Sequence, residues 1–111
     1  MKLDMVEEDN GVTRLILAGR LDMAGVTAVD PQVNAVAGSK SKVVVDLSGV
    51  DFMGSLGMRT LVVAAKTIAG NGGRMAILAP QPNVEKVLRT SGIDTVIPIA
   101  KDLGSAAALV R

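Results

Sequence analysis

A serine within residues 43–61 offers the most specific chemistry in this sequence. The valines that open this stretch predict a buried strand ending at Asp46-Leu47, followed by a loop at residues 48–51 and then a helix. Ser55 then falls at the helix start, where its hydroxyl can accept a backbone N–H as an N-cap worth about 1 kcal/mol over Ala. The free N–H groups and positive dipole end of a helix start also tolerate a phosphate, so the local pattern fits a cap or a modified serine.

The residue types that are missing exclude most catalytic chemistry. The chain has no His and no Cys, which removes His/Cys zinc sites, Ser-His and Cys-His nucleophile pairs, and thiol redox chemistry. Its carboxylates are scattered, without the spacing of a metal site. We therefore expect no catalytic residue, no metal and no cofactor, and a protein that is not an enzyme.

Two glycine-containing segments could suggest a nucleotide-binding enzyme, but neither has the required context. Gly38-Ser39-Lys40-Ser41 precedes a strand, whereas a phosphate-binding loop follows one. Gly70, Gly72 and Gly73 do not precede a helix, as a dinucleotide-binding turn must. Both segments are better interpreted as connectors between a helix and a strand.

Composition places these residues in one small globular unit. With 111 residues, 49% of them apolar, the chain predicts a single domain over residues 1–111. Twelve basic and eleven acidic residues give a net charge of +1, and Phe52 is the only aromatic residue. We therefore expect no direct binding to nucleic acid or membrane. The start has no apolar block behind Lys2, and no stretch of about 18 apolar residues follows, which predicts a cytoplasmic protein.

The strands that must position Ser55 are predicted from short apolar runs. Leu3 and Met5 alternate with polar residues, and residues 12–18 resume the extended pattern, so that Asn10-Gly11 predicts a hairpin with a tight two-residue turn. Residues 43–45 and 75–78 read as central strands covered on both faces. Residues 96–99 read as a last strand at an edge of the sheet, because Pro98 cannot donate a ladder hydrogen bond.

Helical spacing accounts for the remaining segments. Residues 56–69 carry an apolar stripe in which Val62 and Ala65 are expected to face the sheet, and the glycines after residue 69 end this helix. Further helices are predicted at residues 82–91 and, capped by Asp102, up to residue 110. In residues 24–37, Asp30-Pro31 can either start a helix or lie inside one. The result is a mixed α/β domain with about five strands, an N-terminal hairpin and about four helices.

One motif in this framework resembles a known family. Asp46-Leu47-Ser48-Gly49-Val50-Asp51-Phe52-Met53-Gly54-Ser55-Leu56-Gly57-Met58 is similar to the signature of STAS domains, the group that contains bacterial anti-sigma-factor antagonists. Gly19-Arg20-Leu21-Asp22 resembles the Gly-Glu-Leu-Asp that follows the second strand in that family. Gly72-Gly73-Arg74-Met75 and the segment at residues 87–93 resemble its later strand and third helix. The resemblance therefore covers almost the whole chain.

The resemblance implies a switch between protein partners. An unmodified antagonist binds an anti-sigma factor that is also a Ser/Thr kinase and so frees a sigma factor, phosphorylation ends this binding, and a Ser phosphatase resets the cycle. Ser55 matches the phosphoacceptor, and Asp22 matches an acidic position near it, although Asp22 could equally cap the following helix. The expected docking surface consists of Asp22, Gly54, Ser55, Leu56, Gly57 and Arg59. We expect a monomer or weak dimer.

Two departures from the family pattern keep a second function open. The family has Asp immediately before the acceptor serine and Ser or Thr immediately after it, whereas this chain has Gly54 and Leu56. Leu56, pointing outward, would supply apolar area to a partner, while Met58 is expected in the core. The alternative function is therefore a constitutive STAS adaptor, a subunit of a transporter or signalling scaffold that binds its partners without phosphorylation.

Overall fold

The fold is a five-stranded mixed sheet with four helices, as the sequence predicts. The computed structural model describes all 111 residues. The strands, in their order across the sheet, are β1 (Lys2–Glu7), β2 (Thr13–Leu21), β3 (Lys42–Met53), β4 (Arg74–Leu78) and β5 (Ile99–Ala100). The helices are α1 (Met23–Ser39), α2 (Ser55–Gly70), α3 (Pro82–Thr90) and α4 (Leu103–Leu109), with short 3-10 turns at Asp9–Gly11 and Ile93–Thr95. Only β1 pairs antiparallel to its neighbour.

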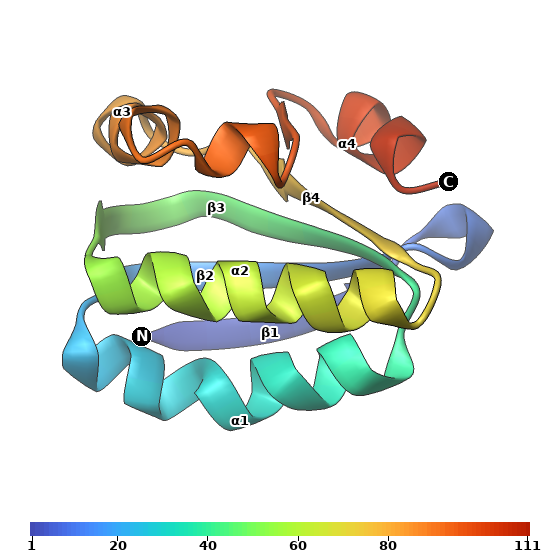
Figure 1. Ribbon diagram of the computed structural model, residues 1–111, viewed down its shortest axis with the longest axis horizontal. Coiled ribbons are helices and arrows are strands. Elements are labelled where there is room, and N and C mark those ends of the chain that lie inside the picture. The colour runs from blue at the N-terminus through green and yellow to red at the C-terminus, as the bar shows by residue number, and fades with distance from the viewer.

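The alternation of side chains along the strands divides the interior into two apolar clusters. Val43 and Val45 of β3 belong to the larger cluster, which also contains buried residues of α1, α2 and α3. Val44 points the other way, into a smaller cluster with Ala106 of α4. The sheet is thus covered on both faces, and α1 and α2 lie side by side along one of them (Figure 1).

The third strand is longer than the sequence predicts. The expected loop at residues 48–51 is wrong, because β3 continues through it to Met53. Its partner β2 extends to Leu21 beside it. The pairing shifts register twice, with one extra β3 residue at each shift, so that Arg20 lies opposite Phe52 and Leu21 opposite Met53. Val50 is fully buried. Pairing with β2 therefore stabilises residues 48–51 as a strand, although most of these residues are polar or glycine. The helix that follows therefore begins directly at a strand end.

The two ends of the sheet also differ in detail from expectation. Asn10 and Gly11 do adopt positive φ angles of 64° and 76°, but the two-residue turn is wrong: the connection spans residues 8–12 and contains a 3-10 turn. The last strand is Ile99–Ala100 rather than residues 96–99. Its edge position is confirmed, and Pro98 contributes only its carbonyl, which accepts from the N–H of Ile77 at 2.8 Å.

The helices settle the alternatives left by the sequence. α1 starts after Asp22 and continues through Pro31, so Asp30-Pro31 lies inside the helix. In α2 the centre of the buried stripe is formed by Leu61, Ala64 and Ile68, and the predicted Val62 and Ala65 are half-buried against the core at its edge. Asp102 caps α4 by accepting from the Ser105 N–H at 2.8 Å, as expected. None of these helices has the length and apolar composition needed to cross a bilayer.

Candidate functional site

Ser55 is the first residue of α2, and its hydroxyl is free. The N-cap position belongs to Gly54, which has extended backbone angles (φ −96°, ψ 177°) and no side chain that could cap the helix. The N-cap interpretation of Ser55 is therefore wrong. Ser55 is exposed, and its hydroxyl makes no hydrogen bond within the chain. An unbonded hydroxyl at the surface is available to a second protein or to a modifying enzyme.

The first turn of α2 carries a positive field. The first helical hydrogen bond runs from the N–H of Met58 to the carbonyl of Gly54 at 3.1 Å, so the N–H groups of Ser55, Leu56 and Gly57 precede it without an intrahelical partner. The turn contains no acidic residue. The partial charge of these N–H groups is therefore not compensated by a side chain of α2, and it favours a negative group placed on Ser55.

The start of α2 is joined to the start of α1 by close backbone packing. The N–H of Gly54 donates to the carbonyl of Leu21 at 3.1 Å. Gly57 is buried against the same residue: a Cβ atom on Gly57 would lie 2.9 Å from the Leu21 Cβ and 2.8 Å from the Met53 Sδ. The sequence analysis placed Gly57 in the docking surface, but the structure places it below that surface, where the missing side chain allows close packing.

Asp22 is the N-cap of α1, which is one of the two roles considered for it. Its Oδ1 accepts from the Gly25 N–H at 2.9 Å, and Arg20 Nε lies 3.5 Å from its Oδ2. The hydrogen bond from Gly25, reinforced by Arg20, holds the pKa of this carboxyl below its usual value. Asp22 follows Leu21, and Ser55 follows Gly54. The hydrogen bond between Leu21 and Gly54 therefore also places Asp22 close to the start of α2, which is the second role considered for it.

Exposed apolar side chains surround this point of the surface. Met23 is 71% exposed, Leu56 41% and Phe52 38%. Exposed apolar side chains that lie together on a surface commonly mark a site where another protein binds. The guanidinium of Arg20 lies over the Phe52 ring at 4.4 Å from its centroid. Sequence reasoning missed Arg20, Met23 and Phe52 as surface residues. The outward direction of Leu56 is confirmed, and Met58 is half-buried against the core.

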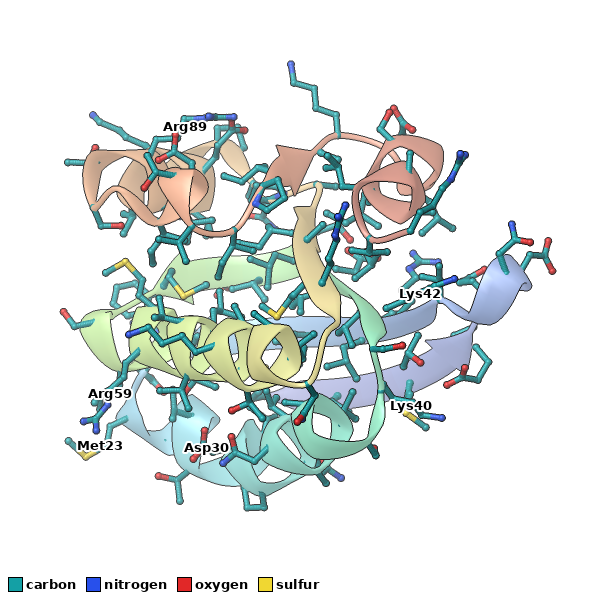
Figure 2. All side chains as sticks on the ribbon, turned by 45° about the vertical axis from the view of Figure 1, so that its right-hand side comes forward. Met23, Asp30, Lys40, Lys42, Arg59 and Arg89 are labelled. Carbon is teal, nitrogen blue, oxygen red and sulfur yellow. The ribbon has the colours of Figure 1, made fainter.

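A groove between α1 and α2 continues this surface. Its volume is about 260 Å³, and it is lined by Val26, Asp30, Asn34, Leu56, Arg59, Thr60 and Val63. The buried Thr60 hydroxyl lies 3.2 Å from the Asp30 carboxylate, which the Asn34 amide approaches at 3.4 Å. Figure 2 shows Arg59 extending from the start of α2 on the side where α1 carries Met23 and Asp30. The sequence suggested Leu56 and Arg59, but no signal pointed to Asp30, because helix pairing is a tertiary feature.

These residues can bind and be modified, but they do not assemble an acid-base or nucleophilic centre. No group of three or more acidic side chains in the chain could hold a metal ion. The site combines one free hydroxyl, an exposed apolar rim, and charges of both signs at Arg20, Asp22, Asp30 and Arg59. This combination is typical of a protein docking surface.

Comparisons with known proteins give similarities over nearly the whole chain. A family model described as STAS domain matches residues 5–106. The anti-sigma-F factor antagonist RsfB of Mycobacterium tuberculosis is 27% identical over 107 residues, covering 96% of this chain and 87% of RsfB. The crystal structure of an anti-sigma factor antagonist from Mycobacterium paratuberculosis superposes with a TM-score of 0.84 at 28% identity, covering 99% of this chain and 95% of that chain.

A more distant structure shares the fold. The Bacillus cell fate determinant SpoIIAA, solved in its phosphorylated form, superposes with a TM-score of 0.71 at 19% identity, covering 94% of this chain and 96% of SpoIIAA. The likeness to SpoIIAA extends along nearly the full length of both chains, so the fold is common to both proteins.

Proposed function

This chain belongs to the STAS domain family, and on that premise we propose that it is an anti-sigma-factor antagonist that changes partners when Ser55 is phosphorylated. The relatives that it matches over most of their length are anti-sigma-factor antagonists, which are regulatory rather than catalytic proteins. In this proposal the chain is not itself an enzyme. An anti-sigma factor with Ser/Thr kinase activity is one partner, and a Ser phosphatase is the other.

The observation that carries the proposal is the free, exposed hydroxyl of Ser55 at the start of α2. It stands beside uncompensated N–H groups and within an apolar rim formed by Met23, Phe52 and Leu56. In the unmodified state the hydroxyl is neutral, so a partner can cover the rim without burying a charge. Covering apolar surface stabilises the complex by about 25 cal/mol per Å² before the costs of association.

Phosphorylation reverses this balance at the same position. The kinase transfers the γ-phosphoryl group of ATP to the Ser55 oxygen, releasing ADP and the hydroxyl proton, and the phosphatase hydrolyses the ester to serine and inorganic phosphate. The added group carries about −1.5 to −2 charge, which the helix start favours by about 0.3 to 2 kcal/mol. The fold therefore tolerates the modification.

The complex does not tolerate it, because the partner surface must fit a hydroxyl and the apolar Leu56. A buried phosphate loses its hydration there unless the partner supplies a cation, and this costs several kcal/mol. A penalty of about 3 kcal/mol already lowers the affinity more than a hundredfold. The affinity of the anti-sigma factor for the chain therefore falls while the chain stays folded.

The test uses the anti-sigma-factor Ser/Thr kinase encoded nearest to this gene in its genome. The two proteins are incubated with ATP, and the modified residue is mapped by mass spectrometry. Binding of the kinase is then compared for the wild type, Ser55→Ala, Ser55→Asp and the control Ser41→Asp, which adds the same charge at the opposite end of β3, where Ser41 is also exposed.

We expect phosphate on Ser55 alone, unchanged binding by Ser55→Ala and Ser41→Asp, and at least about tenfold weaker binding by Ser55→Asp, a difference of about 1.4 kcal/mol. If Ser55 is never modified and Ser55→Asp binds as tightly as the wild type, the switch is wrong. The constitutive adaptor, a STAS subunit of a transporter or scaffold, is then the remaining function.

A further inference from the structure

Arg59 lies four residues after Ser55 on α2, and both residues are exposed. Residues at this spacing lie on one face of a helix, and helical side chains lean toward the N-terminus of the helix. From position 59 an arginine side chain is long enough to turn back over the first turn of α2 and meet a group on Ser55. An anion that precedes a cation by four residues is the favourable order for pairing on a helix.

Arg59 has no ion-pair partner in the unmodified chain. The seven salt bridges of the structure engage Arg14, Arg20 and Arg89 among the arginines, but not Arg59. Arg59 instead lines the α1–α2 groove, where Asp30 is the only other charged residue. The groove thus contains one positive and one negative side chain that do not form a salt bridge with each other.

We infer that Arg59 is the cation that pairs with a phosphate on Ser55, and that this pairing withdraws its guanidinium from the α1–α2 groove. The inference rests on the proposed modification of Ser55 and adds a second consequence to it. The groove, balanced in charge while Ser55 is unmodified, is left with Asp30 alone. A partner that contacts both the α2 start and the groove then meets a changed charge at two places.

The neighbouring charged groups do not offer an equivalent partner for the phosphate. Arg20, the other arginine of this surface, is engaged by both the Asp22 carboxylate and the Phe52 ring. The acids on the elements around the α2 start are Asp22 of the β2–α1 junction, Asp51 of β3 and Asp30 of α1. All three repel a phosphate, whereas Arg59 forms no salt bridge and can pair with one.

The test installs phosphoserine at position 55 of the full chain during translation, so that it depends on no kinase. The second pKa of the phosphate, ordinarily about 6, is measured by phosphorus NMR titration in the wild type and in Arg59→Gln. Lys66→Gln is the matched control, because Lys66 is exposed on the same helix but lies about 16 Å from Ser55 along the helix axis. Arg59→Lys tests rescue by a different cation.

A paired cation favours the dianion, so we expect the phosphate pKa to rise by about 0.3 units in Arg59→Gln, the size of a helical ion pair at this spacing. Lys66→Gln should shift the pKa by less than about 0.1 units because salt screens that distance. Arg59→Lys should restore most of the wild-type pKa. Equal values in the wild type and Arg59→Gln would overturn the pairing.

Withdrawal from the groove has its own readout. The methyl signals of Val26 and Val63, which line the groove, should shift on phosphorylation in the wild type and in Lys66→Gln, but much less in Arg59→Gln. Equal shifts in all three proteins would show that Arg59 does not leave the groove. Because the phosphate is installed directly, these measurements do not depend on a kinase. A kinase that never modifies Ser55 and binds Ser55→Asp as tightly as the wild type would refute the proposed function and leave them unaffected.

Discussion

The backbone N–H of Gly54 donates a 3.1 Å hydrogen bond to the carbonyl of Leu21. This bond joins the end of β3 and the start of α2 to the end of β2 and the start of α1. It sets Ser55 and the cap residue Asp22 on adjacent segments of one surface. Two pieces of chain that are far apart in sequence therefore contribute to a single site.

The Ser55 hydroxyl should contribute little to stability, because it is exposed and bonds to nothing in the chain. We expect Ser55→Ala to change the free energy of unfolding by less than about 0.5 kcal/mol. Asp22→Ala should lower the free energy of unfolding measurably more, since it removes the hydrogen bond to the Gly25 N–H. Urea unfolding of both variants measures this difference, and a comparable loss in Ser55→Ala would mean that its hydroxyl does cap α2.

Gly57 should tolerate no larger residue. A Cβ there would lie 2.8 Å from the Met53 Sδ and 3.0 Å from the Leu21 carbonyl oxygen, so Gly57→Ala should lower the free energy of unfolding by about 1 to 3 kcal/mol. Gly70→Ala, at the other end of the same helix, meets nothing within 4 Å and should raise it by about 0.5 kcal/mol. Thermal melting distinguishes the two, and equal effects would exclude tight packing at Gly57.

Restoring the family's Asp before Ser55 should have two opposite effects. Gly54 is the N-cap of α2 with an ordinary extended φ, so Gly54→Asp supplies a capping carboxylate. Its Cβ would lie 3.3 Å from Cε2 of the exposed Phe52 ring, which must shift slightly, so the fold should be stabilised by at most about 0.3 kcal/mol. The new charge would also repel a phosphate on Ser55 and raise its pKa. Melting curves and phosphorus NMR of the Ser55-phosphorylated variant test both, and a lower phosphate pKa would contradict this prediction.

Asp46 should make the fold sensitive to acid. Its side chain is only 3% exposed, and burial would raise its pKa. The Ser48 N–H at 2.9 Å and Arg14 Nη2 at 2.6 Å outweigh this effect and hold the pKa below its usual value. The stability gained is complete above the unfolded pKa of about 4 and is lost as the pH falls through the lower folded pKa.

The corresponding experiment is urea unfolding of the wild type and Asp46→Asn between neutral and strongly acidic pH. Asp46→Asn should be about 1 to 3 kcal/mol less stable at pH 7, because the charge-assisted hydrogen bond to Arg14 is lost. It should lose less stability than the wild type as the pH falls below about 4. Asp22 and Asp102, whose pKa values are also lowered, leave a residual acid dependence in both proteins. Parallel pH curves would contradict a role for Asp46.

The sequence by itself determined the order of elements and the position of Ser55 at a helix start. Apolar runs identify the strands, because side chains alternate in a strand and the central strands of this sheet are covered on both faces. Residues such as Asp102 and Gly92 mark helix ends through local hydrogen bonding and a φ of 83°. These signals depend on neighbouring residues only, so they can be identified without knowing the tertiary structure.

Tertiary structure alone decided where β3 ends, which residue caps α2 and what surrounds Ser55. Residues 48–51 form a strand because β2 continues beside them, and Gly54 takes the cap position because Leu21 accepts its N–H. The groove that contains Asp30 and Arg59 exists only because α1 packs on α2. Each of these features depends on a contact between distant segments, whose energy does not appear in the local pattern of either one.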